Sequence, residues 1–382
     1  MSRRPRLEAS AVDEPAPEVD RLEGFPHPRQ TTTLHGHAEA ERALLASIAS
    51  GRMHHAWLVT GPEGIGKATL SYRAAKFLLS RGAAPALIAS EDLATAADVP
   101  AVRQVVALSH PGLLVIRRAW DPQKKRTPQA ITVDEVRRLK NFLAHSVEPG
   151  AYRVVIVDQA DEMNANAANA LLKSLEEPPA RTVFLLVASE PGRLPATIGS
   201  RCRRLDLKPL PEADLAAAVA GPLAASQAPP LDADRARLLA ALSRGSVRRA
   251  LQLGSKDGLK LYGRLLGLVA ALPRLDHAAV QKLATELSGP AAEQAFDMGV
   301  ALLTDMLGRL VRQAATGAGA IAGEAEIAER LLAPKSLATY AALWETIGRD
   351  KTLAQTLNLD RKAFIVETFL RLEGLGRGGA GA

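Results

Sequence analysis

A glycine-rich stretch at residues 61–69, GPEGIGKAT, contains the residue types that bind phosphate. Gly61 and Gly66 have the spacing of a phosphate-binding loop, and Lys67 stands where a lysine reaches the β- and γ-phosphates of a nucleotide. Glycines let backbone N–H groups wrap the phosphates, and the N-terminus of the following helix favours the anion. Ala68 departs from the pattern, because the usual hydroxyl there binds the Mg²⁺ that bridges the phosphates. An alanine side chain offers that ion no oxygen.

A second candidate for phosphate chemistry is Asp158, the last residue of the apolar run RVVIVD (153–158). An acid at the end of a buried strand can hold the metal directly or through water. Gly64 adds a third glycine to the loop. Because loop, lysine and acid occur in this order, we favour a nucleotide site over the alternative, a tight strand-to-helix turn with a surface lysine.

The segments that must position these residues alternate between apolar strands and amphipathic helices. HAWLVT (55–60) and KATLSYRAAKFLLS (67–80) place the glycine loop between a strand and a helix, as a phosphate-binding loop requires. Near-continuous apolar strands alternating with helices indicate a parallel sheet covered on both faces. Further strands are predicted at 113–118, 153–158 and 181–189, and further helices at 38–51, 133–146 and 164–177.

Strand-like runs disappear after Pro209, and only helical patterns follow. The sequence therefore predicts an α/β P-loop domain with a parallel sheet, then a small helical lid and an all-α C-terminal domain. The predicted segments are a flexible tail at 1–28, the P-loop domain at 29–208, the lid at 209–256, the C-terminal helical domain at 257–374 and a second tail at 375–382.

Composition limits the class of protein. A length of 382 residues with 47% apolar residues fits two or three domains. The net charge of +7 leans toward nucleic acid or another polyanion, although 4% aromatic residues are too sparse for a base-stacking platform. The single cysteine, Cys202, excludes an internal disulfide framework and a four-cysteine zinc site. We see neither a secretory signal nor a membrane-spanning run, and expect a cytoplasmic protein.

Three motifs resemble those of the bacterial clamp-loader AAA+ family. They are VVIVDQADEMNANAANALLKSLEEPP (154–179), LPATIGSRC (194–202) and GSVRRAL (245–251). Their order and spacing across residues 30–255 are similar to the AAA+ module of that family. The resemblance implies that the C-terminal helices form an oligomerisation domain, a collar that joins five subunits, while a self-contained helical bundle is the alternative. The N-terminal tail and the segment 81–109 lie outside the resemblance, and the role of that segment stays open.

The resemblance also implies a role for each matching residue. Asp158 matches the metal-associated acid, and Ser189 matches the polar residue called sensor 1. Arg201 matches an arginine finger that is offered to the ATP site of a neighbouring subunit, where a surface arginine bonded to a helix carbonyl is the alternative. Arg248 matches the sensor 2 arginine that contacts the γ-phosphate in active members. Thr69 matches a hydroxyl that lies near the α-phosphate in the family.

Two departures from the family pattern affect the same half-reaction. Ala68 removes an oxygen ligand of Mg²⁺, and Gln159 stands where active members carry the glutamate that polarises the attacking water. An amide cannot accept the proton of that water, and a positioned base is typically worth about 10²–10⁴-fold in rate. We therefore expect that hydrolysis is lost, that ATP or ADP binds without turnover if it binds, and that no cofactor is required.

The resemblance then implies a stator subunit of the DNA polymerase III clamp loader, within the DNA polymerase holoenzyme. Such a subunit assembles with gamma/tau and delta subunits and, through the complex, serves the sliding clamp and primed DNA. Two alternatives stay open at this point. One is an active clamp-loader ATPase of the gamma/tau type, and the other is a stand-alone P-loop binding protein unrelated to replication.

Three weaker signals complete the sequence. Family members commonly carry a four-cysteine zinc module before the second strand, but residues 81–112 contain no cysteine, so we expect no zinc. Cys202 is predicted to be a packed small thiol. The loop at 121–129 carries Lys124, Lys125 and Arg126, for which a solvated loop is favoured and a contact with DNA phosphates is the alternative.

Overall fold

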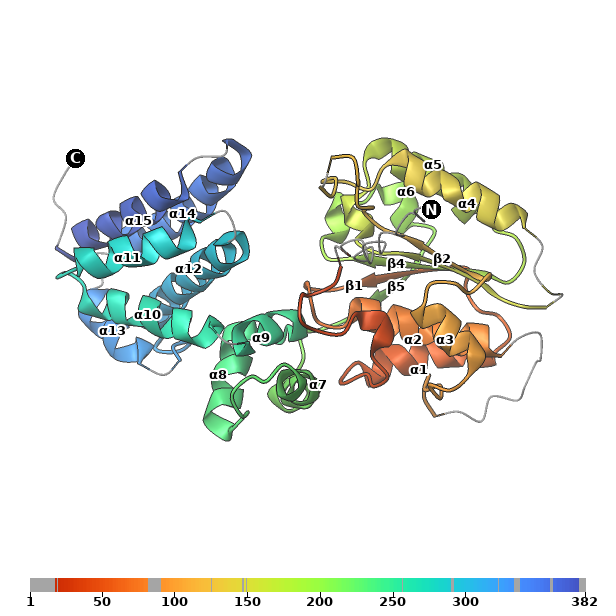
Figure 1. Ribbon diagram of the computed structural model, residues 1–382, viewed down its shortest axis with the longest axis horizontal. Coiled ribbons are helices and arrows are strands. Elements are labelled where there is room, and N and C mark those ends of the chain that lie inside the picture. The colour runs from red at the N-terminus through yellow and green to blue at the C-terminus, as the bar shows by residue number, and fades with distance from the viewer. Residues whose placement is uncertain are drawn as a thin grey trace, which may run out of the picture. The chain divides into compact units, whose positions relative to one another are not determined.

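The computed structural model describes residues 18, 20–81, 91–124, 126–145, 148, 150–255, 257–289, 292–321, 323–332, 337–357 and 360–377. The chain divides into two compact units, with the boundary between Leu210 and Pro211 (Figure 1). The first unit contains the sheet and every strand of the described chain, and the second contains only helices.

The first unit is built on a five-stranded sheet in the order β2-β3-β4-β1-β5, and all of its neighbouring strands run parallel. The three central strands are buried almost throughout, because a parallel sheet with helices on both faces exposes neither side to water. The predicted fold class is confirmed. The strands are β1 (Ala56–Thr60), β2 (Leu113–Ile116), β3 (Arg153–Val157), β4 (Thr182–Ala188) and β5 (Arg203–Asp206).

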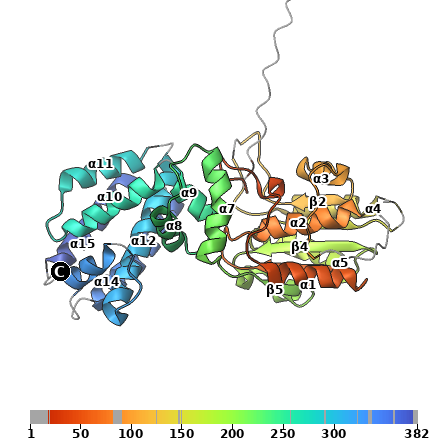
Figure 2. The same cartoon turned by 90° about the horizontal axis from the view of Figure 1, so that it is seen from below.

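Helices cover both faces of this sheet. One face carries α1 (Ala38–Ala49), α2 (Lys67–Ser80) and α3 (Pro100–Val106) (Figure 1). Figure 2 shows the same helices from below. The other face carries α4 (Val133–Ala144), α5 (Ala165–Glu176) and the short α6 (Ala196–Gly199). Three 3-10 turns lie between these elements, at η1 (Pro28–Gln30), η2 (Ala160–Glu162) and η3 (Pro191–Arg193).

The core between the sheet and α4 and α5 holds the strand ends in place. Leu171 and Leu175, one helical turn apart on α5, are fully buried against strand residues such as Phe184. Full burial of one such leucine contributes about 1.5–3 kcal/mol. The carboxyl ends of β1, β3 and β4 therefore stand on a rigid base, and the candidate site residues follow those ends.

The second unit is helical throughout its described residues. Its helices are α7 (Glu212–Ala225), α8 (Ala233–Ser243), α9 (Val247–Gly254), α10 (Gly258–Ala271), α11 (His277–Leu287), α12 (Glu293–Thr316), α13 (Glu324–Leu331), α14 (Leu337–Leu357) and α15 (Arg361–Gly376). A buried ion pair fastens α13 to α12, since Arg309 donates two hydrogen bonds of 2.9 and 2.7 Å to Glu324. The hydroxyl of Tyr262 on α10 donates to the same carboxylate. The division of this unit into a lid and a C-terminal helical domain stays a prediction.

The short helix α6, the strand β5 and the helix α3 of the first unit were not predicted from the sequence. β5 is short and polar, RRLD, and only Leu205 of its four residues is buried, so the run does not look like a strand of a covered sheet. α3 lies in the segment that falls outside the resemblance. Among the described residues, no helix has the length and apolar character that a membrane crossing requires.

Candidate functional site

The glycine loop follows β1 and leads into α2, as predicted. Gly61, Gly64 and Gly66 all adopt positive φ angles, of 138°, 75° and 110°. A Cβ on Gly61 would collide with the backbone carbonyl of Leu207, so only glycine fits there. Gly66 ends the loop directly before the first residue of α2. The backbone therefore has the shape that directs N–H groups toward an anion at a helix N-terminus.

Lys67 is buried and folded back onto this loop. Its Nζ donates hydrogen bonds to the carbonyl oxygens of Gly61 and Pro62, at 2.7 and 2.6 Å, and to Ser189 Oγ at 3.0 Å. Burial lowers the pKa of Lys67 to about 8, although nearby carboxylates oppose that shift. The structure thus brings together two residues, Lys67 and Ser189, that lie 122 positions apart in the sequence.

Ser189 is itself held by an acid that sequence reasoning missed. Asp161, in the η2 turn after β3, is buried, and its Oδ2 accepts the backbone N–H groups of Ser189 and Glu190 at 2.9 and 2.7 Å. A carboxylate that accepts two amides fixes the end of β4 relative to the turn after β3. The signal was present in the motif, because VVIVDQADE contains a second aspartate three residues after Asp158.

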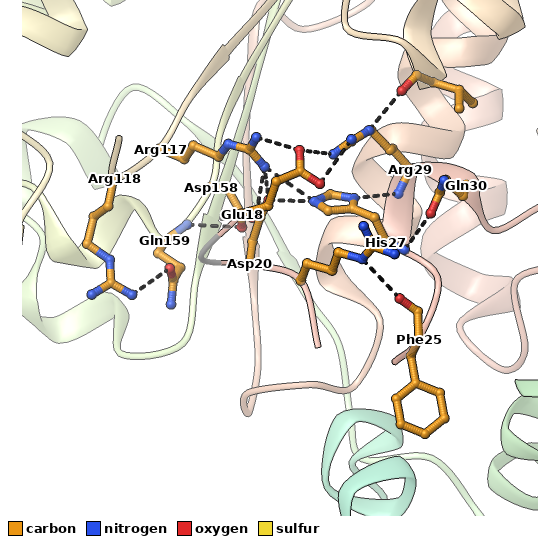
Figure 3. A network of polar contacts seen from close by, with 12 residues as sticks. Glu18, Asp20, Phe25, His27, Arg29, Gln30, Arg117, Arg118, Asp158 and Gln159 are labelled. Atoms are coloured by element: carbon orange, nitrogen blue, oxygen red, sulfur yellow. Dashed lines mark hydrogen bonds and ion pairs between the residues drawn. The ribbon is translucent and has the colours of Figure 1, made fainter. Parts of the chain in front are cut away.

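Asp158 lies at the end of β3, as predicted, and only 5% of it is exposed. Its Oδ1 accepts the backbone N–H of Gln159 at 3.1 Å, and its carboxyl lies beside that of Asp20 (Figure 3). Burial, reinforced by the negative charge of Asp20, raises the pKa of the Asp158 carboxyl. The raised pKa favours the protonated form of the Asp158 carboxyl, which binds a metal ion less well than a carboxylate does.

Asp20 belongs to a stretch for which the sequence predicts a flexible tail. Residues 1–17 and 19 lie outside the described part of the chain, but Glu18 and the residues from Asp20 onward pack on the first unit, and His27 is completely buried. Long-range ion pairs of Glu18, Asp20 and Arg29, which local composition cannot show, join these residues to the first unit.

The two functional positions that depart from the family pattern have no carboxylate or hydroxyl in the structure either. Ala68 is the second residue of α2, and Thr69 follows it. Gln159 adopts a left-handed backbone with φ of 55°, and its Oε1 accepts a hydrogen bond of 3.3 Å from Arg118. The amide is therefore held by an arginine next to the pocket and supplies no base.

Arg201 lies on the turn between α6 and β5. Its Nη1 donates to the carbonyl oxygen of Thr197 at 2.8 Å, and its Nη2 lies 2.7 Å from Glu176 Oε1 at the end of α5. The side chains of Arg201 and Glu176 are 35% and 49% exposed. In the isolated chain this arginine therefore makes the helix-carbonyl bond of the alternative interpretation and stays accessible to solvent.

Arg248 is on α9 of the second unit, so it does not share a compact unit with the glycine loop. The loop at 121–129 is partly described. Lys124 Nζ lies 3.5 Å from Asp121 Oδ2, and Arg126 pairs its backbone with Asp121, while Lys125 lies outside the described residues. Burial raises the pKa of Cys202 to about 11, which keeps its thiol protonated at neutral pH.

The described residues contain no group of three or more His, Cys, Asp or Glu side chains arranged to hold a metal ion. The site thus combines a well-formed phosphate loop and a buried lysine with an acid that is already engaged. This arrangement can cradle an anion. Ala68 contributes no oxygen to it, and Gln159 contributes an amide where a base would stand.

Comparison with known proteins identifies the family. A family model described as "DNA polymerase III, delta subunit" matches residues 36–211. The delta' subunit of DNA polymerase III from Pseudomonas aeruginosa is 39% identical over 164 residues, which cover 42% of this chain and 46% of that protein. The delta' subunit from Yersinia pestis is 30% identical over 257 residues, which cover 62% of this chain and 68% of that protein. The chain belongs to the delta' family of DNA polymerase III.

The match to the Pseudomonas aeruginosa delta' subunit spans about half the length of that relative. A tau subunit of DNA polymerase III also matches, from Bacillus subtilis, at 26% identity over 290 residues that cover 75% of this chain and 47% of that protein. The resemblance to this group of DNA polymerase III subunits is thereby confirmed, and the two delta' subunits named above are more identical to the chain than this tau subunit is.

Proposed function

We propose that this chain is the delta' stator subunit of the DNA polymerase III clamp loader. It assembles with gamma/tau and delta subunits, and the complex places the sliding clamp on primed DNA. Its own hydrolysis of ATP is lost, and Arg201 completes the ATP site of a neighbouring subunit. Membership of the delta' family supports the assembly, while the contrast between the pocket and Arg201 supports the division of labour.

The observation that carries this proposal is the contrast between a pocket whose acid is already engaged and an Arg201 side chain that is accessible. Ala68 and Gln159 offer neither a ligand for Mg²⁺ nor a base, and Asp158 is engaged with Asp20. Arg201 is held by the carbonyl of Thr197, by a long contact of 3.5 Å to Ser200 Oγ and by the half-exposed carboxylate of Glu176. A guanidinium with such weak restraints can move onto a phosphate at little cost in free energy, because exposed ion pairs contribute about 0–1 kcal/mol.

The test is Arg201→Ala in a complex reconstituted with gamma/tau and delta. An arginine finger acting in trans is worth about 10³–10⁵-fold in phosphoryl transfer, so hydrolysis at the adjoining site should be nearly lost while assembly persists. Arg204→Ala is the matched control, because Arg204 is an exposed arginine on β5 whose carboxylate partner is Asp206. Unimpaired DNA-stimulated hydrolysis with Arg201→Ala would show that the finger assignment is wrong.

A second candidate is an active ATPase of the gamma/tau type, which the match to the tau subunit of Bacillus subtilis favours. Lys67, Ser189 and Asp158 all persist in the pocket, as such an enzyme requires. Purified chain separates the two functions. The stator predicts no turnover of ATP above background, whereas turnover that Lys67→Ala abolishes would establish the ATPase.

A further inference from the structure

The P-loop fold implies a nucleotide with Mg²⁺, and the residues present do not fit that ion. Magnesium demands near-ideal octahedral geometry from oxygen ligands and loses its water reluctantly. Ala68 supplies no oxygen, and the carboxyl of Asp20 lies beside that of Asp158 (Figure 3). The mismatch therefore has two parts, one in the sequence of the loop and one in a contact that only the structure reveals.

We propose that Glu18 and Asp20–Gln30 occupy the metal side of the nucleotide pocket and keep divalent cations away from Asp158. We call these residues the N-terminal strap. In this proposal Asp20 takes the place beside Asp158 that a metal and its water would need. The pocket is thereby closed by the chain itself, in addition to lacking catalytic groups.

Asp20 is held firmly where it meets Asp158. Arg117, directly after β2, donates from Nη1 to both oxygens of Asp20, at 2.5 and 2.7 Å. His27 Nε2 lies 2.8 Å from Asp20 Oδ2 (Figure 3). Because the N–H of Arg29 donates to His27 Nδ1, that nitrogen is an acceptor and the proton of the neutral ring lies on Nε2, pointing at Asp20. The side chains of Asp20 and His27 are 8% and 1% exposed.

A second layer of contacts anchors the rest of the strap. Glu18 lies 2.9 Å from Arg117 Nη2 and 2.7 Å from Arg29 Nη1. Arg29 also donates from Nε to the carbonyl oxygen of Val106, at the end of α3, at 2.8 Å. The strap is therefore tied to the end of β2 and to α3 at separate points, and cooperation between these points makes release of Asp20 alone costly.

The local sequence forms the turn that presents His27. Pro28 begins the 3-10 turn η1, where its missing N–H costs nothing. Gln30 Oε1 accepts the N–H of His27 at 2.8 Å, while the His27 ring accepts the N–H of Arg29, so the two side chains cap the turn reciprocally. The ring also packs edge-on against Tyr72 of α2, with centroids 5.7 Å apart. Residues 27–30 thus have a defined shape that aims the histidine at Asp20.

The test separates the two parts of the mismatch with a double-mutant cycle on the isolated full-length chain. Ala68→Ser restores the missing hydroxyl, and Asp20→Ala removes the strap carboxyl. Binding of a fluorescent ADP analogue is measured with and without Mg²⁺. If the strap leaves the pocket open in no more than about one molecule in ten, its release strengthens apparent affinity about tenfold. We expect this Mg²⁺-dependent gain in affinity for the ADP analogue in the double variant and no such gain in Ala68→Ser alone.

Glu23→Ala in the Ala68→Ser background is the matched control. Glu23 is an exposed acid of the same strap, and it should leave the pocket closed. Asp20→Asn should also leave it closed, because the amide preserves both the shape and a hydrogen bond to Asp158. Glu18→Ala loosens the anchor without altering the Asp20–Asp158 pair, and should give a smaller Mg²⁺-dependent gain. This variant keeps the test decisive if thermal melting shows that Asp20→Ala does not fold.

Two results would overturn the proposal. A Mg²⁺-dependent gain in Ala68→Ser alone would mean that the strap does not close the pocket. Absence of a gain in every strap variant would mean that Asp20 is not what keeps the metal out. Because the experiment needs no partner subunit, its failure is distinguishable from failure of the proposed function, which depends on Arg201 in the assembled complex.

Discussion

The surroundings of Asp158 and of Arg201 differ in how firmly they are held. Asp158 is buried, and the side chain of the adjacent Asp20 is 8% exposed and makes several short contacts with Arg117 and His27. Arg201 contacts one carbonyl, Ser200 Oγ at 3.5 Å and one half-exposed carboxylate. A buried network resists exchange of its partners because each group would be left unpaired in a low dielectric, whereas an exposed pair exchanges readily. Asp158, the acid of the chain's own pocket, is therefore held in place, whereas Arg201 stays accessible.

Arg117→Ala should produce the largest change in stability, because it removes the guanidinium that compensates Glu18 and Asp20. Breaking a fully buried ion pair on one side typically costs about 3–5 kcal/mol, but the side chain of Arg117 is 21% exposed. The free energy of unfolding, measured by urea denaturation, should therefore fall by about 1.5–3 kcal/mol, as for hydrogen bonds to charged groups. Arg204→Ala, at an exposed pair, should stay within about 0.5 kcal/mol of the native chain. Equal losses for both variants would mean that the Asp158 network is no firmer than the surface.

Asp158→Asn should change how stability depends on pH. The folded chain raises the pKa of Asp158, so the folded state holds a proton that the unfolded chain loses near pH 4. This group therefore stabilises the fold fully below that pH and loses its contribution as pH rises through the folded pKa. The contribution is about 1.4 kcal/mol for each pH unit that separates the folded pKa from the unfolded pKa. From pH 4 to pH 8 the free energy of unfolding should decline less in Asp158→Asn than in the native chain. Parallel curves would contradict the raised pKa.

Glu176→Gln should have a small effect on ATP hydrolysis by the complex, and it tests how readily Arg201 leaves its partner. It removes the carboxylate that competes for Arg201, and an exposed pair of this kind is worth up to about 1 kcal/mol. Hydrolysis at the adjoining site of the assembled complex should therefore rise by up to about fivefold. Glu177→Gln is the matched control at the next residue. A lower rate with Glu176→Gln would mean that this carboxylate positions the finger instead of competing for it.

Lys67→Ala should have the smallest effect of all in the assembled complex. If the pocket of this chain never hydrolyses ATP, removal of its lysine leaves DNA-stimulated hydrolysis and clamp loading unchanged. The measurement is steady-state ATP hydrolysis with and without primed DNA, next to a complex that carries Arg201→Ala. A loss as large as that of Arg201→Ala would erase the distinction between the two regions.

Local pattern predicted the parts of the fold that rest on local physics. The apolar runs around Trp57, Val155 and Phe184 indicate covered parallel strands, and the glycine loop indicates its own turn between β1 and α2. β5 was not predicted because an edge strand with one buried residue has no apolar run. The packing of the N-terminal strap on the first unit was not predicted for a different reason. Its order depends on Arg117, 97 residues away from Asp20, and composition alone describes this stretch as polar and proline-containing.

The same limit applies to the candidate site. The sequence named Lys67, Ser189 and Asp158, and the structure places the first two in contact. It could not name Asp20 as the partner of Asp158, because nothing in the spacing of residues 18–30 refers to β3. Nor could it show that Arg201 rests on Glu176, since that contact joins the end of α5 to a turn beyond the next strand.

The two amides that Asp161 accepts give the pocket a mechanical property. One carboxylate oxygen clamps the first residue after β4 to the turn after β3, so these two loops move as a single body. An anion that displaces Lys67 from Ser189 removes one of the contacts of this joined pair of loops. The Asp161 contacts thus connect the serine that binds Lys67 to the turn that begins at Gln159, which is itself held by Arg118.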